Sequence, residues 1–518
     1  MIVIPEARAL LFQFDDPNAA LKQIPFSSLI EHEGQQFVMV PHHEDSVKLL
    51  RNLGLKVPGM MTYYYDWPGR FPPWYHQRVT AEFCVENDRC FVLNEIGTGK
   101  TASVIWAADY LRKKGKVQKV LIASPKSTLR EVWEKEIAQI DPAAKVAVVH
   151  GTPDKRTKLL AGDYDYFIFT HKGLEWYAQR QRKDVDLIII DELANFKTKS
   201  TKLWAALDFI ITPKMRAIGM TGTPTPNEPT DAWAQAKAMK TGKGNVPKFF
   251  GAFRREVMQQ LTQYRWIPIP GWERRIYDLM QPAVRFTRDG CFDLPETTYT
   301  NRKVDLTSTQ TAVYDLVKRD LYAEYQQGKI LAVNEATKIM RLVQVASGVV
   351  YDTEQNHLVL GADARIAELK QIYDEVGGKI IVFAPYTGTV QYIYSQLKDV
   401  ASCAMVYGET SMTKRSDIFN KFQNTEDIRI LIAQPGTMAH GLTLTRSATI
   451  VWFAPINNNG IYTQANGRIT RPGQKAHTNI IHLYATVEER RMFQHLKNKT
   501  RMEGILLAEF AKGTQSWN

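Results

Sequence analysis

The stretch LNEIGTGKTA, residues 93–102, places a lysine and a threonine after two glycines, a combination that suits a phosphate group. The usual pattern is G-x-x-x-x-G-K-[ST], in which backbone N–H groups surround the phosphates and the lysine reaches their oxygens. Gly99, Lys100 and Thr101 match the end of this pattern, whereas Asn94 occupies the position of its first glycine. The stretch predicts a variant phosphate-binding loop. The alternative is a structural turn with a chance resemblance.

The residues around the loop favour the phosphate-binding interpretation. An apolar run at 89–94 predicts a short buried strand, and apolar residues at helical spacing predict a helix that ends at Gly115. Gly97 and Gly99, on either side of Thr98, allow the backbone to approach a ligand closely. The N-terminus of the following helix would present N–H groups and partial positive charge to a phosphate.

A pair of carboxylates follows the apolar run of DLIIIDELANFK, where Asp191 and Glu192 stand at a predicted strand end. Phosphoryl transfer needs Mg²⁺ near the β- and γ-phosphates and a group that orients or activates the nucleophile. We expect Asp191 and the Thr101 hydroxyl to hold Mg²⁺, and Glu192 to act as the base. The alternative is a solvated strand end, since Asp-Glu pairs are common.

Composition sets broad limits on these hypotheses. The 518 residues suffice for two or three domains, and a hydrophobic content of 44% with 23% charged residues is ordinary for a globular protein. The net charge of +12 favours an anionic partner, most simply nucleic acid, although a basic surface without a partner is the alternative. No apolar run approaches the roughly 18 residues of a membrane span, and the N-terminus does not predict a signal peptide.

The four cysteines lack the spacing of a metal site, so we expect no structural metal. Their small number indicates a reducing compartment. We expect a cytoplasmic protein of a bacterial or virus-infected cell, with the nucleus as the alternative.

The elements that must position these residues fall into three regions. Residues 1–70 predict a small α+β N-terminal domain, with a strand in QQFVMVP and a helix in HEDSVKLLRNLG. Over 71–295, short apolar runs alternate with helical patterns, as in a buried parallel sheet with a site at its C-terminal edge. The alternation recurs over 296–518. We expect an α/β protein whose nucleotide lies between two lobes.

Eight motifs follow one another over residues 72–500: PWYHQ, NEIGTGKT, ASPKST, FTHKGL, DELANFK, MTGTPTPNEP, AHGLTLT and QANGRITRPGQ. In this order they resemble the superfamily-two helicase-like ATPases, and most closely the Swi/Snf-type DNA translocases. The resemblance implies two tandem RecA-like lobes, ATP and Mg²⁺ as cofactors, and hydrolysis that depends on DNA. That family normally has Asp at position 94, so Asn94 is a small departure from its pattern.

The resemblance also implies roles for individual residues. Contacts to the nucleotide are expected from Gln77 at the adenine, from Asn94, Gly97, Thr98, Gly99, Lys100 and Thr101 at the phosphates, and from Gly441 and Gln464 in the second lobe. Thr221 and Thr223 are expected to link hydrolysis to movement. Two residues depart from the family pattern: Ala194 replaces a histidine and Thr443 an asparagine.

The last motif contains two arginines one helical turn apart, Arg468 and Arg471, so both can face the cleft. A γ-phosphate that leaves in a loose transition state spreads negative charge over its oxygens, and an arginine delivered from the other lobe contributes ~10³–10⁵ in rate. We expect Arg471 to be this finger and Arg468 to contact the γ-phosphate or Glu192. An ordinary basic helix face is the alternative.

DNA contacts are expected mainly at phosphates, which position a protein without reading sequence. Candidates lie at strand ends of both lobes: Lys126, Ser127, His171, Tyr386, Thr387 and Thr437. Lys126 is alternatively a solvated loop charge, and Tyr386 a core residue. The aromatic stretch 61–75 either stacks on unpaired bases or packs two modules together, and we favour packing.

The sequence as a whole predicts a monomeric ATPase, stimulated by DNA, that translocates on duplex DNA and remodels forks or junctions. The rival enzyme is a helicase that separates strands of DNA or RNA. The rival of another class is a nucleotide-binding scaffold without productive turnover. The N-terminal domain is expected to recognise the branched substrate.

Overall fold

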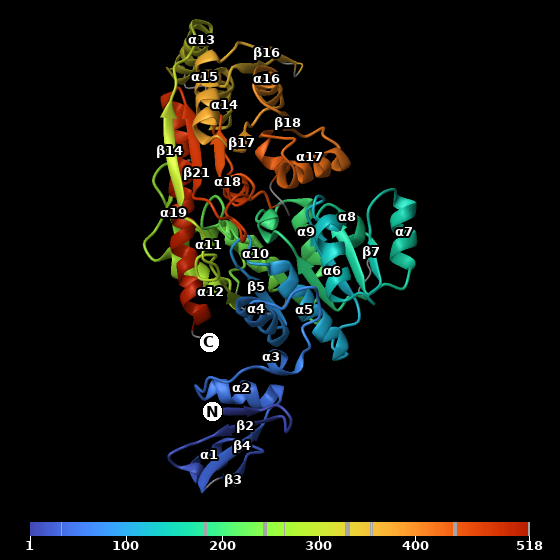
Figure 1. Ribbon diagram of the computed structural model, residues 1–518. Coiled ribbons are helices and arrows are strands. Elements are labelled where there is room, and N and C mark those ends of the chain that lie inside the picture. The colour runs from blue at the N-terminus through green and yellow to red at the C-terminus, as the bar shows by residue number, and fades with distance from the viewer. Residues whose placement is uncertain are drawn as a thin grey trace.

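The computed structural model describes residues 1–518 except 33, 181–183, 242–245, 264, 327–331, 353, 355, 439–442 and 516–518. For 320–326, 332–338 and 515 it describes the backbone but not the side chains. Three units are stacked in Figure 1: a small N-terminal unit at the bottom, a first α/β lobe in the middle and a second α/β lobe at the top.

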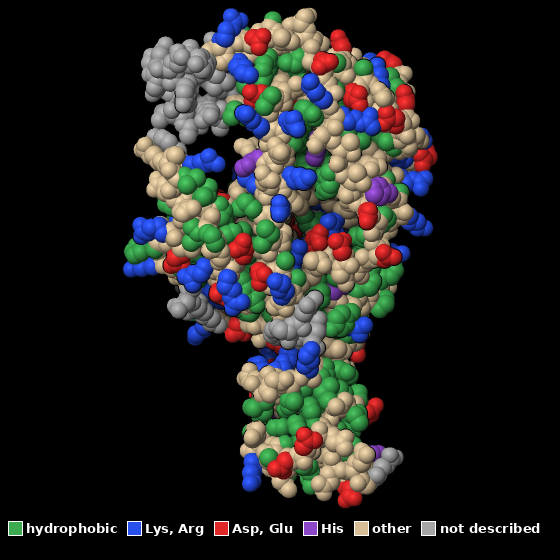
Figure 2. All heavy atoms as spheres, turned by 90° about the vertical axis from the view of Figure 1, so that its left-hand side faces the viewer, with side chains coloured by type: hydrophobic (Ala, Val, Ile, Leu, Met, Phe, Trp, Pro, Cys, Tyr) green, Lys and Arg blue, Asp and Glu red, His purple; other side chains and the backbone are tan. Residues whose placement is uncertain are grey.

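The N-terminal unit is a four-stranded antiparallel sheet in the order β1-β2-β4-β3, covered by helices. Val38 and Val40 alternate inward on one strand and pack against Val47 and Leu50, which lie three residues apart on a helix. Its elements are β1 (Ile2–Ile4), β2 (Ala9–Phe12), α1 (Pro17–Gln23), β3 (Ser28–His32), β4 (Gln35–Pro41) and α2 (Glu44–Asn52). The short helix α3 (Met60–Tyr64) follows, and its Met61 belongs to a core cluster of the first lobe. In Figure 2 this unit protrudes below the lobes and shows a hydrophobic patch on the visible face.

The first lobe contains a seven-stranded parallel sheet in the order β13-β5-β10-β9-β6-β8-β7. Separate hydrophobic clusters cover its two faces, which explains why its strands are continuous apolar runs. The strands are β5 (Arg89–Val92), β6 (Val120–Ser124), β7 (Val146–Val148), β8 (Tyr166–Thr170), β9 (Leu187–Ile190), β10 (Arg216–Met220) and β13 (Ala283–Val284), with a separate antiparallel pair, β11 (Met258–Gln260) and β12 (Trp266–Pro268).

The helices of the first lobe connect these strands. They are α4 (Tyr75–Glu86), α5 (Lys100–Lys113), the π-helical η1 (Leu129–Glu134), α6 (Lys135–Ile140), α7 (Pro153–Ala161), α8 (Gly173–Ala178), the 3₁₀ turn η2 (Leu193–Phe196), α9 (Lys202–Ile210), α10 (Asp231–Met239), α11 (Phe250–Val257) and α12 (Trp272–Leu279).

The second lobe contains a six-stranded parallel sheet in the order β14-β21-β20-β17-β19-β18. Its strands are β14 (Thr297–Lys303), β17 (Ile380–Phe383), β18 (Cys403–Val406), β19 (Ile430–Ala433), β20 (Thr449–Trp452) and β21 (Thr478–Tyr484), and a small antiparallel pair is formed by β15 (Val349–Tyr351) and β16 (His357–Val359). Its helices are α13 (Ser308–Gln326), α14 (Ala332–Ala346), α15 (Asp363–Val376), α16 (Thr387–Leu397), α17 (Met412–Asn424), η3 (Pro435–Met438), α18 (Asn459–Asn466) and α19 (Val487–Gln515). The two parallel sheets and the small antiparallel unit confirm the predicted fold class.

Helix α19 belongs to both lobes. It starts in the second lobe, where Phe493 and Leu496 join the core, and descends along the first lobe to the C-terminus (Figure 1). There Leu506 and Phe510 are part of the first lobe's core. The helix therefore crosses the boundary expected between 71–295 and 296–518.

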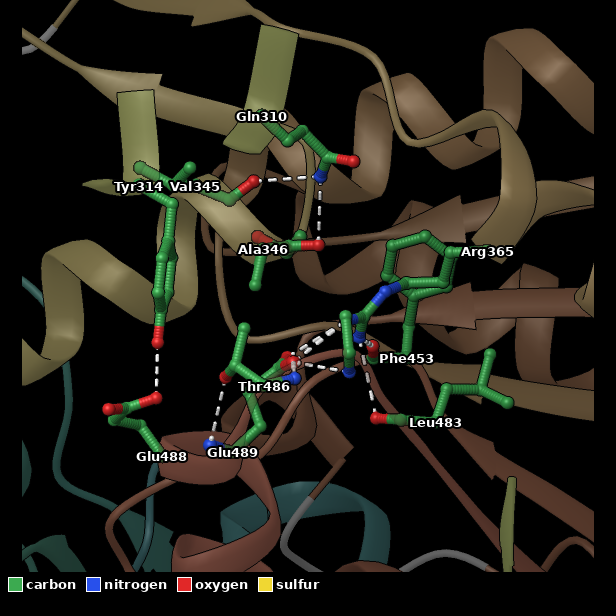
Figure 3. A network of polar contacts seen from close by, with 12 residues as sticks. Gln310, Tyr314, Val345, Ala346, Arg365, Phe453, Leu483, Thr486, Glu488 and Glu489 are labelled. Carbon is green, nitrogen blue, oxygen red and sulfur yellow. Dashed lines mark hydrogen bonds and ion pairs between the residues drawn. The ribbon is translucent and has the colours of Figure 1, made fainter. Parts of the chain in front are cut away.

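The root of α19 is fixed by a buried ion pair between Glu489 and Arg365 of α15, at 2.9 Å. Glu489 also accepts hydrogen bonds from the backbone N–H groups of Ala485 and Thr486. Figure 3 shows this network beside Glu488, which points toward Tyr314 of α13. A buried carboxylate with this many donors holds the start of the helix rigidly against the second lobe.

The aromatic exit from the N-terminal unit packs against the first lobe. Tyr65 and Trp67 make edge contacts with Tyr110 and Trp106 of α5, and the Trp106 indole donates to the Pro68 carbonyl at 2.7 Å. These rings serve packing. Among the described residues, none of the helices has both the length and the apolar character needed to cross a bilayer.

Candidate active site

The glycine loop connects β5 to α5 as the sequence predicts. Gly97 and Gly99 have φ angles of +91° and +74°, a region that residues with a Cβ rarely adopt. A Cβ on Gly99 would also lie 2.1 Å from Nε2 of Gln77. Position 99 therefore has to be glycine, because a larger residue would collide with Gln77 of α4. The loop continues directly into α5, whose N-terminal N–H groups can bind a phosphate.

Lys100 is the first residue of α5, and its amine donates to the carbonyls of Asn94 and Glu95 at 2.8 and 3.1 Å. Burial lowers its pKa to about 8, against the opposing effect of the Glu192 carboxylate. Buried positive charge of this kind is stabilised by an anion, so the amine is suited to phosphate oxygens.

Asn94 does not line the cavity beside the loop. Its Nδ2 donates to the Thr80 hydroxyl at 2.8 Å, and its Oδ1 accepts from the backbone N–H of Phe286 at 2.9 Å. The expected nucleotide contact is therefore replaced by a brace that joins the loop to α4 and to the segment after β13. Neutral Asn supplies both a donor and an acceptor here, whereas an ionised Asp only accepts.

Glu192 follows β9 in the left-handed region, with φ of +56° and ψ of +55°. Such a conformation costs energy in a residue with a side chain and occurs often at functional sites. One carboxylate oxygen accepts from the Thr221 hydroxyl at 3.1 Å. Burial raises its pKa to about 7, and Asp191 contributes in the same direction. A carboxylate with this pKa is well matched to accepting a proton near neutral pH.

Asp191 is oriented by two donors from the first lobe. Its Oδ2 accepts from the Ser124 hydroxyl and from the Trp133 indole, both at 3.1 Å. His171 also stabilises this turn, because its Nε2 lies within hydrogen-bond distance, 2.8 Å, of the Asp191 carbonyl oxygen. His171 is also buried, and burial lowers its pKa. The ring therefore supports the acidic turn. It is buried, whereas the predicted DNA contact would need an exposed ring.

The second lobe contributes Gln464 from α18 and the two arginines after it. Arg471 donates from Nε to the Gly467 carbonyl and from Nη1 to the Thr443 hydroxyl, both at 3.1 Å. Burial lowers its pKa to about 10, and the charge of Arg288 acts in the same direction. Burial and the neighbouring Arg471 also lower the pKa of Arg468, while Glu192 opposes this. The two lobes thus meet with arginines facing a carboxylate.

A cavity of about 530 Å³ lies between these groups. Residues from both lobes line it: Gly97, Gly99, Lys100, Thr101, Asp191 and Glu192 from the first, and Thr443, Gln464, Arg468 and Arg471 from the second. Its volume lies within the range of about 300–1,000 Å³ that is typical for small-molecule sites. These groups fit a nucleoside triphosphate, because Lys100 and the arginines can neutralise the negative charge of its phosphates. The hydroxyl of Thr101 and the carboxylate of Asp191 are hard oxygen ligands of the kind that Mg²⁺ prefers.

Sequence reasoning missed three charged residues that line this cavity, Glu131, Lys135 and Glu136, and it also missed Arg288 nearby. Glu136 lines it, and its Oε2 is buried without a hydrogen-bond partner in the structure. Burial raises its pKa to about 7. Arg288 bridges the lobes, because it pairs with Glu95 at 2.5 Å and donates to the Thr470 carbonyl at 2.6 Å. The spacing Trp133-x-x-Glu136 on one helical turn was a usable signal for Glu136, whereas no local pattern marks Arg288.

Other predicted positions lie around the cavity without lining it. Gln77 accepts from the Trp74 backbone and reaches the Gly99 carbonyl only at 3.4 Å. Thr223 is buried, and its N–H donates to the Thr221 hydroxyl. Gly441 lies outside the described residues.

The expected DNA contacts are spread over both lobes. Lys126 is exposed after β6, next to half-buried Ser127. Thr387 begins α16 and accepts from Gln434, and Thr437 lies in η3. Tyr386 is half-buried, and its hydroxyl donates to the Met340 carbonyl of α14 at 3.3 Å.

Comparison with known families covers most of the chain. Residues 43–349 match the SNF2-related domain, and residues 364–473 match the helicase conserved C-terminal domain. The first match begins within the region expected to form the N-terminal domain. It therefore includes α2 and the aromatic exit.

Relatives resemble the chain at low identity. A putative protein p41 of Acyrthosiphon pisum secondary endosymbiont phage 1 is 25% identical over 80% of this chain and 93% of its own length. An uncharacterized ATP-dependent helicase of Mycoplasma genitalium is 24% identical over 80% of this chain, which spans only 40% of that protein. The human DNA annealing helicase and endonuclease ZRANB3 is 24% identical over 81% of this chain and 39% of its own length. The solved Sulfolobus solfataricus SWI2/SNF2 ATPase core in complex with dsDNA aligns over 87% of this chain and 96% of its own, with 20% identity and a TM-score of 0.42.

Proposed function

This chain belongs to the SNF2-related family of helicase-like, nucleic-acid-dependent ATPases, and from that premise we propose that it uses ATP to translocate on duplex DNA and to remodel branched DNA. The family membership confirms the resemblance found in the sequence. The observation that carries the proposal is the cavity between the lobes, to which the first lobe contributes a lysine and two carboxylates and the second two arginines.

In the proposed reaction, Lys100 and Arg468 bind phosphate oxygens and Glu192 accepts a proton from the attacking water. Its pKa of about 7 leaves a substantial fraction ionised at neutral pH. Arg471 stabilises charge that develops on the transferred phosphoryl group. Mg²⁺, held by Thr101 and Asp191, would neutralise charge on the β- and γ-phosphates when bound.

Because the arginines come from the other lobe, the reaction requires the lobes to be close together, and loss of phosphate charge weakens that closure. Thr221 donates to Glu192 and belongs to the segment that reaches α19, where the Thr225 N–H donates to Glu503 at 3.2 Å. We propose that this segment transmits the state of the phosphate to the second lobe. DNA is proposed to lie against Lys126, Ser127, Thr387 and Thr437, where α16 presents its N-terminus to a phosphate.

The relatives give limited support for the kind of remodelling. The name of human ZRANB3 includes annealing helicase, which fits branched DNA as the substrate. The phage and mycoplasma relatives fit a bacterial or virus-infected cell as the setting.

The decisive assay compares ATP turnover without nucleic acid and with single-stranded DNA, blunt duplex, forked DNA or RNA. We expect duplex and forked DNA to stimulate turnover most. Displacement of a triplex-forming strand from a long duplex measures translocation, and conversion of a stalled fork to a four-way junction measures remodelling.

Each rival gives a different pattern in this assay. Release of a single strand from a simple duplex would favour a strand-separating helicase. ATP binding without turnover under every condition would leave a nucleotide-binding scaffold. Stimulation by RNA alone would contradict DNA as the substrate.

A further inference from the structure

A second cavity, of about 550 Å³, opens on the first lobe outside the nucleotide site. The segment after η2, the start of α10 and the start of α11 form its walls. We call it the lysine–phenylalanine groove, and define it by Lys197, Lys199, Trp233, Lys248, Phe249 and Phe250. None of these residues has a role in the nucleotide site described above.

The groove presents an unusually exposed aromatic ring. Phe249 is 66% exposed and Phe250 41% exposed. Phe250 makes an edge contact with Trp233, whose indole donates to the Pro247 carbonyl at 2.8 Å. Phe249 has no ring partner among the residues that the structure describes. The buried tryptophan thus fixes the chain at 247–250 and leaves the Phe249 ring facing solvent.

The groove contains three lysines and two acids, and both acids have partners within the groove. Asp231 pairs with Lys197 at 3.7 Å, and Glu228 accepts from the Thr230 hydroxyl. Within the described part of the chain, Lys199 and Lys248 have no carboxylate within ion-pair distance. Both lie over aromatic rings, Lys199 over Trp204 and Trp233 and Lys248 over Phe249.

The lysines also repel one another. Burial lowers the pKa of Lys237, which lies over Trp233, and the charges of Lys199 and Lys248 lower it further. An anion placed among these amines would relieve the repulsion.

The basic character continues onto the second lobe. Arg491, His495 and Lys499 are four residues apart on α19, so they share one face, and all three line a neighbouring cavity of about 320 Å³. Lys499 lies close enough to the groove for the charges of Asp231, Lys197 and Glu228 to affect its pKa. The acid of this cavity, Glu488, turns to Tyr314 as Figure 3 shows. Arg491 and Lys499 therefore extend the positive charge along α19, whereas burial and the charge of Lys499 lower the pKa of His495.

We propose that the lysine–phenylalanine groove binds an unpaired segment of DNA, with a base stacked on Phe249 and the backbone phosphates beside Lys199, Lys248 and Lys499. Positively charged grooves with exposed aromatic rings are the general solution for single strands, because each base has a π-face. Within a duplex, all bases except those of the terminal pairs have their faces covered by neighbours, so they cannot stack on an isolated ring. The groove thus distinguishes a branch with single-stranded arms from a continuous duplex.

This inference rests on the proposed DNA-dependent function and adds a substrate feature to it. The test measures affinity at constant salt for three DNAs: a blunt duplex, the same duplex with unpaired arms, and a four-way junction with fully paired arms. The proteins are the wild type, Phe249→Leu, Phe249→Tyr and the control Phe209→Leu, which alters an exposed ring of the same lobe outside the groove.

We expect Phe249→Leu to reduce the preference for unpaired arms over blunt duplex about tenfold, since loss of one stacked base has an effect of this order or greater. Binding of blunt duplex and of the paired junction should be unchanged. Phe249→Tyr should retain the preference because it keeps the ring, and the Phe209 control should match the wild type. Arms carrying 5-iododeoxyuridine should crosslink to the peptide that contains residue 249, as identified by mass spectrometry.

An unchanged preference in Phe249→Leu overturns the proposal and leaves an acidic protein segment as the occupant of the groove. Absence of any preference for unpaired arms in the wild type also overturns it. If the leucine variant is misfolded by circular dichroism, Lys248→Ala, at an exposed lysine, replaces it and is expected to give a smaller loss. Failure of the proposed function is recognised separately, because duplex would then not stimulate wild-type turnover.

Discussion

The two sides of the nucleotide cavity are organised differently. On the first-lobe side each functional group has partners within its own lobe: Lys100 has two loop carbonyls, Glu192 has the Thr221 hydroxyl, and Asp191 has Ser124 and Trp133. On the second-lobe side the two arginines lie close enough for their charges to interact, with Arg468 buried and Arg471 half-buried. Arg471 donates to Thr443 and Gly467 but has no carboxylate partner among the described residues.

This difference indicates a division of labour. Under the proposed function, the first lobe has partners in place that order the groups expected to bind phosphate and orient water. The second lobe supplies two arginines whose charges repel each other, and an anion between the lobes would reduce that repulsion. Ground-state binding should therefore depend mainly on the first lobe, and acceleration of the chemical step on the second.

The largest effect is expected on the first-lobe side. Lys100→Ala or Glu192→Gln should abolish DNA-stimulated hydrolysis, because phosphate binding or proton acceptance is lost, while DNA binding stays largely intact. A phosphate-release assay at saturating duplex measures hydrolysis, and fluorescence anisotropy measures DNA binding. Lys114→Ala, at an exposed lysine near the end of the same helix, is the matched control. Hydrolysis by Glu192→Gln near the wild-type rate would remove the assignment of the base.

The second-lobe side is tested by Arg471→Ala. Turnover should fall ~10³-fold or more with little change in ATP affinity, because a finger acts chiefly in the transition state. Single-turnover rates and binding of a fluorescent ATP analogue separate the two effects. Arg446→Ala alters an exposed arginine of the same lobe and should match the wild type. Collapse of ATP binding with normal turnover at saturation would make Arg471 a ground-state ligand and erase the contrast between the lobes.

The pH dependence tests which carboxylate of the first lobe acts as the base. Glu192 has a pKa of about 7, so protonation below that pH removes the base, and kcat/KM for ATP should fall about tenfold per pH unit on the acid side. Lys100 has a pKa of about 8, so loss of its charge should lower kcat/KM above that pH. Glu136 also titrates near 7. The variant Glu136→Gln should keep the acid limb, and loss of that limb would transfer the titration to Glu136.

The smallest effect concerns the N-terminal unit, which contributes to neither side of the cavity. Met61 and Tyr65 belong to the first lobe's core, so the deletion should end before them. A protein that starts at Pro58 retains both. We expect it to keep duplex-stimulated turnover but to lose a few-fold preference for forks and four-way junctions. The ratio of branched to linear stimulation is the measurement, with circular dichroism confirming the fold. An unchanged ratio would make the unit a structural brace and place branch preference in the lobes.

Local spacing predicted Lys100 and Glu192 as central residues of the site, and the family resemblance predicted Arg471. Lys100, Glu192 and Arg471 lie in short motifs whose strand, turn and helix are fixed by neighbouring residues, and the structure brings them to one cavity. The alternating apolar runs likewise predicted the two parallel sheets. What could not be predicted depends on distant pairing. Asn94 turns toward Thr80 and Phe286, and His171 turns under Asp191, because of elements that meet only in the folded lobe.

The long helix α19 restricts how the two lobes move. One covalent connection joins them between β13 and β14, and α19, about 44 Å long at 1.5 Å per residue, is a second attachment, fixed at Glu489 in one lobe and at Leu506 and Phe510 in the other. A body attached to another at one point can swivel in any direction. A lobe that is attached at two separate points can rotate only about the axis through those two points. Under the proposed function, each round of closing and opening would therefore follow the same arc, as steps in a single direction require.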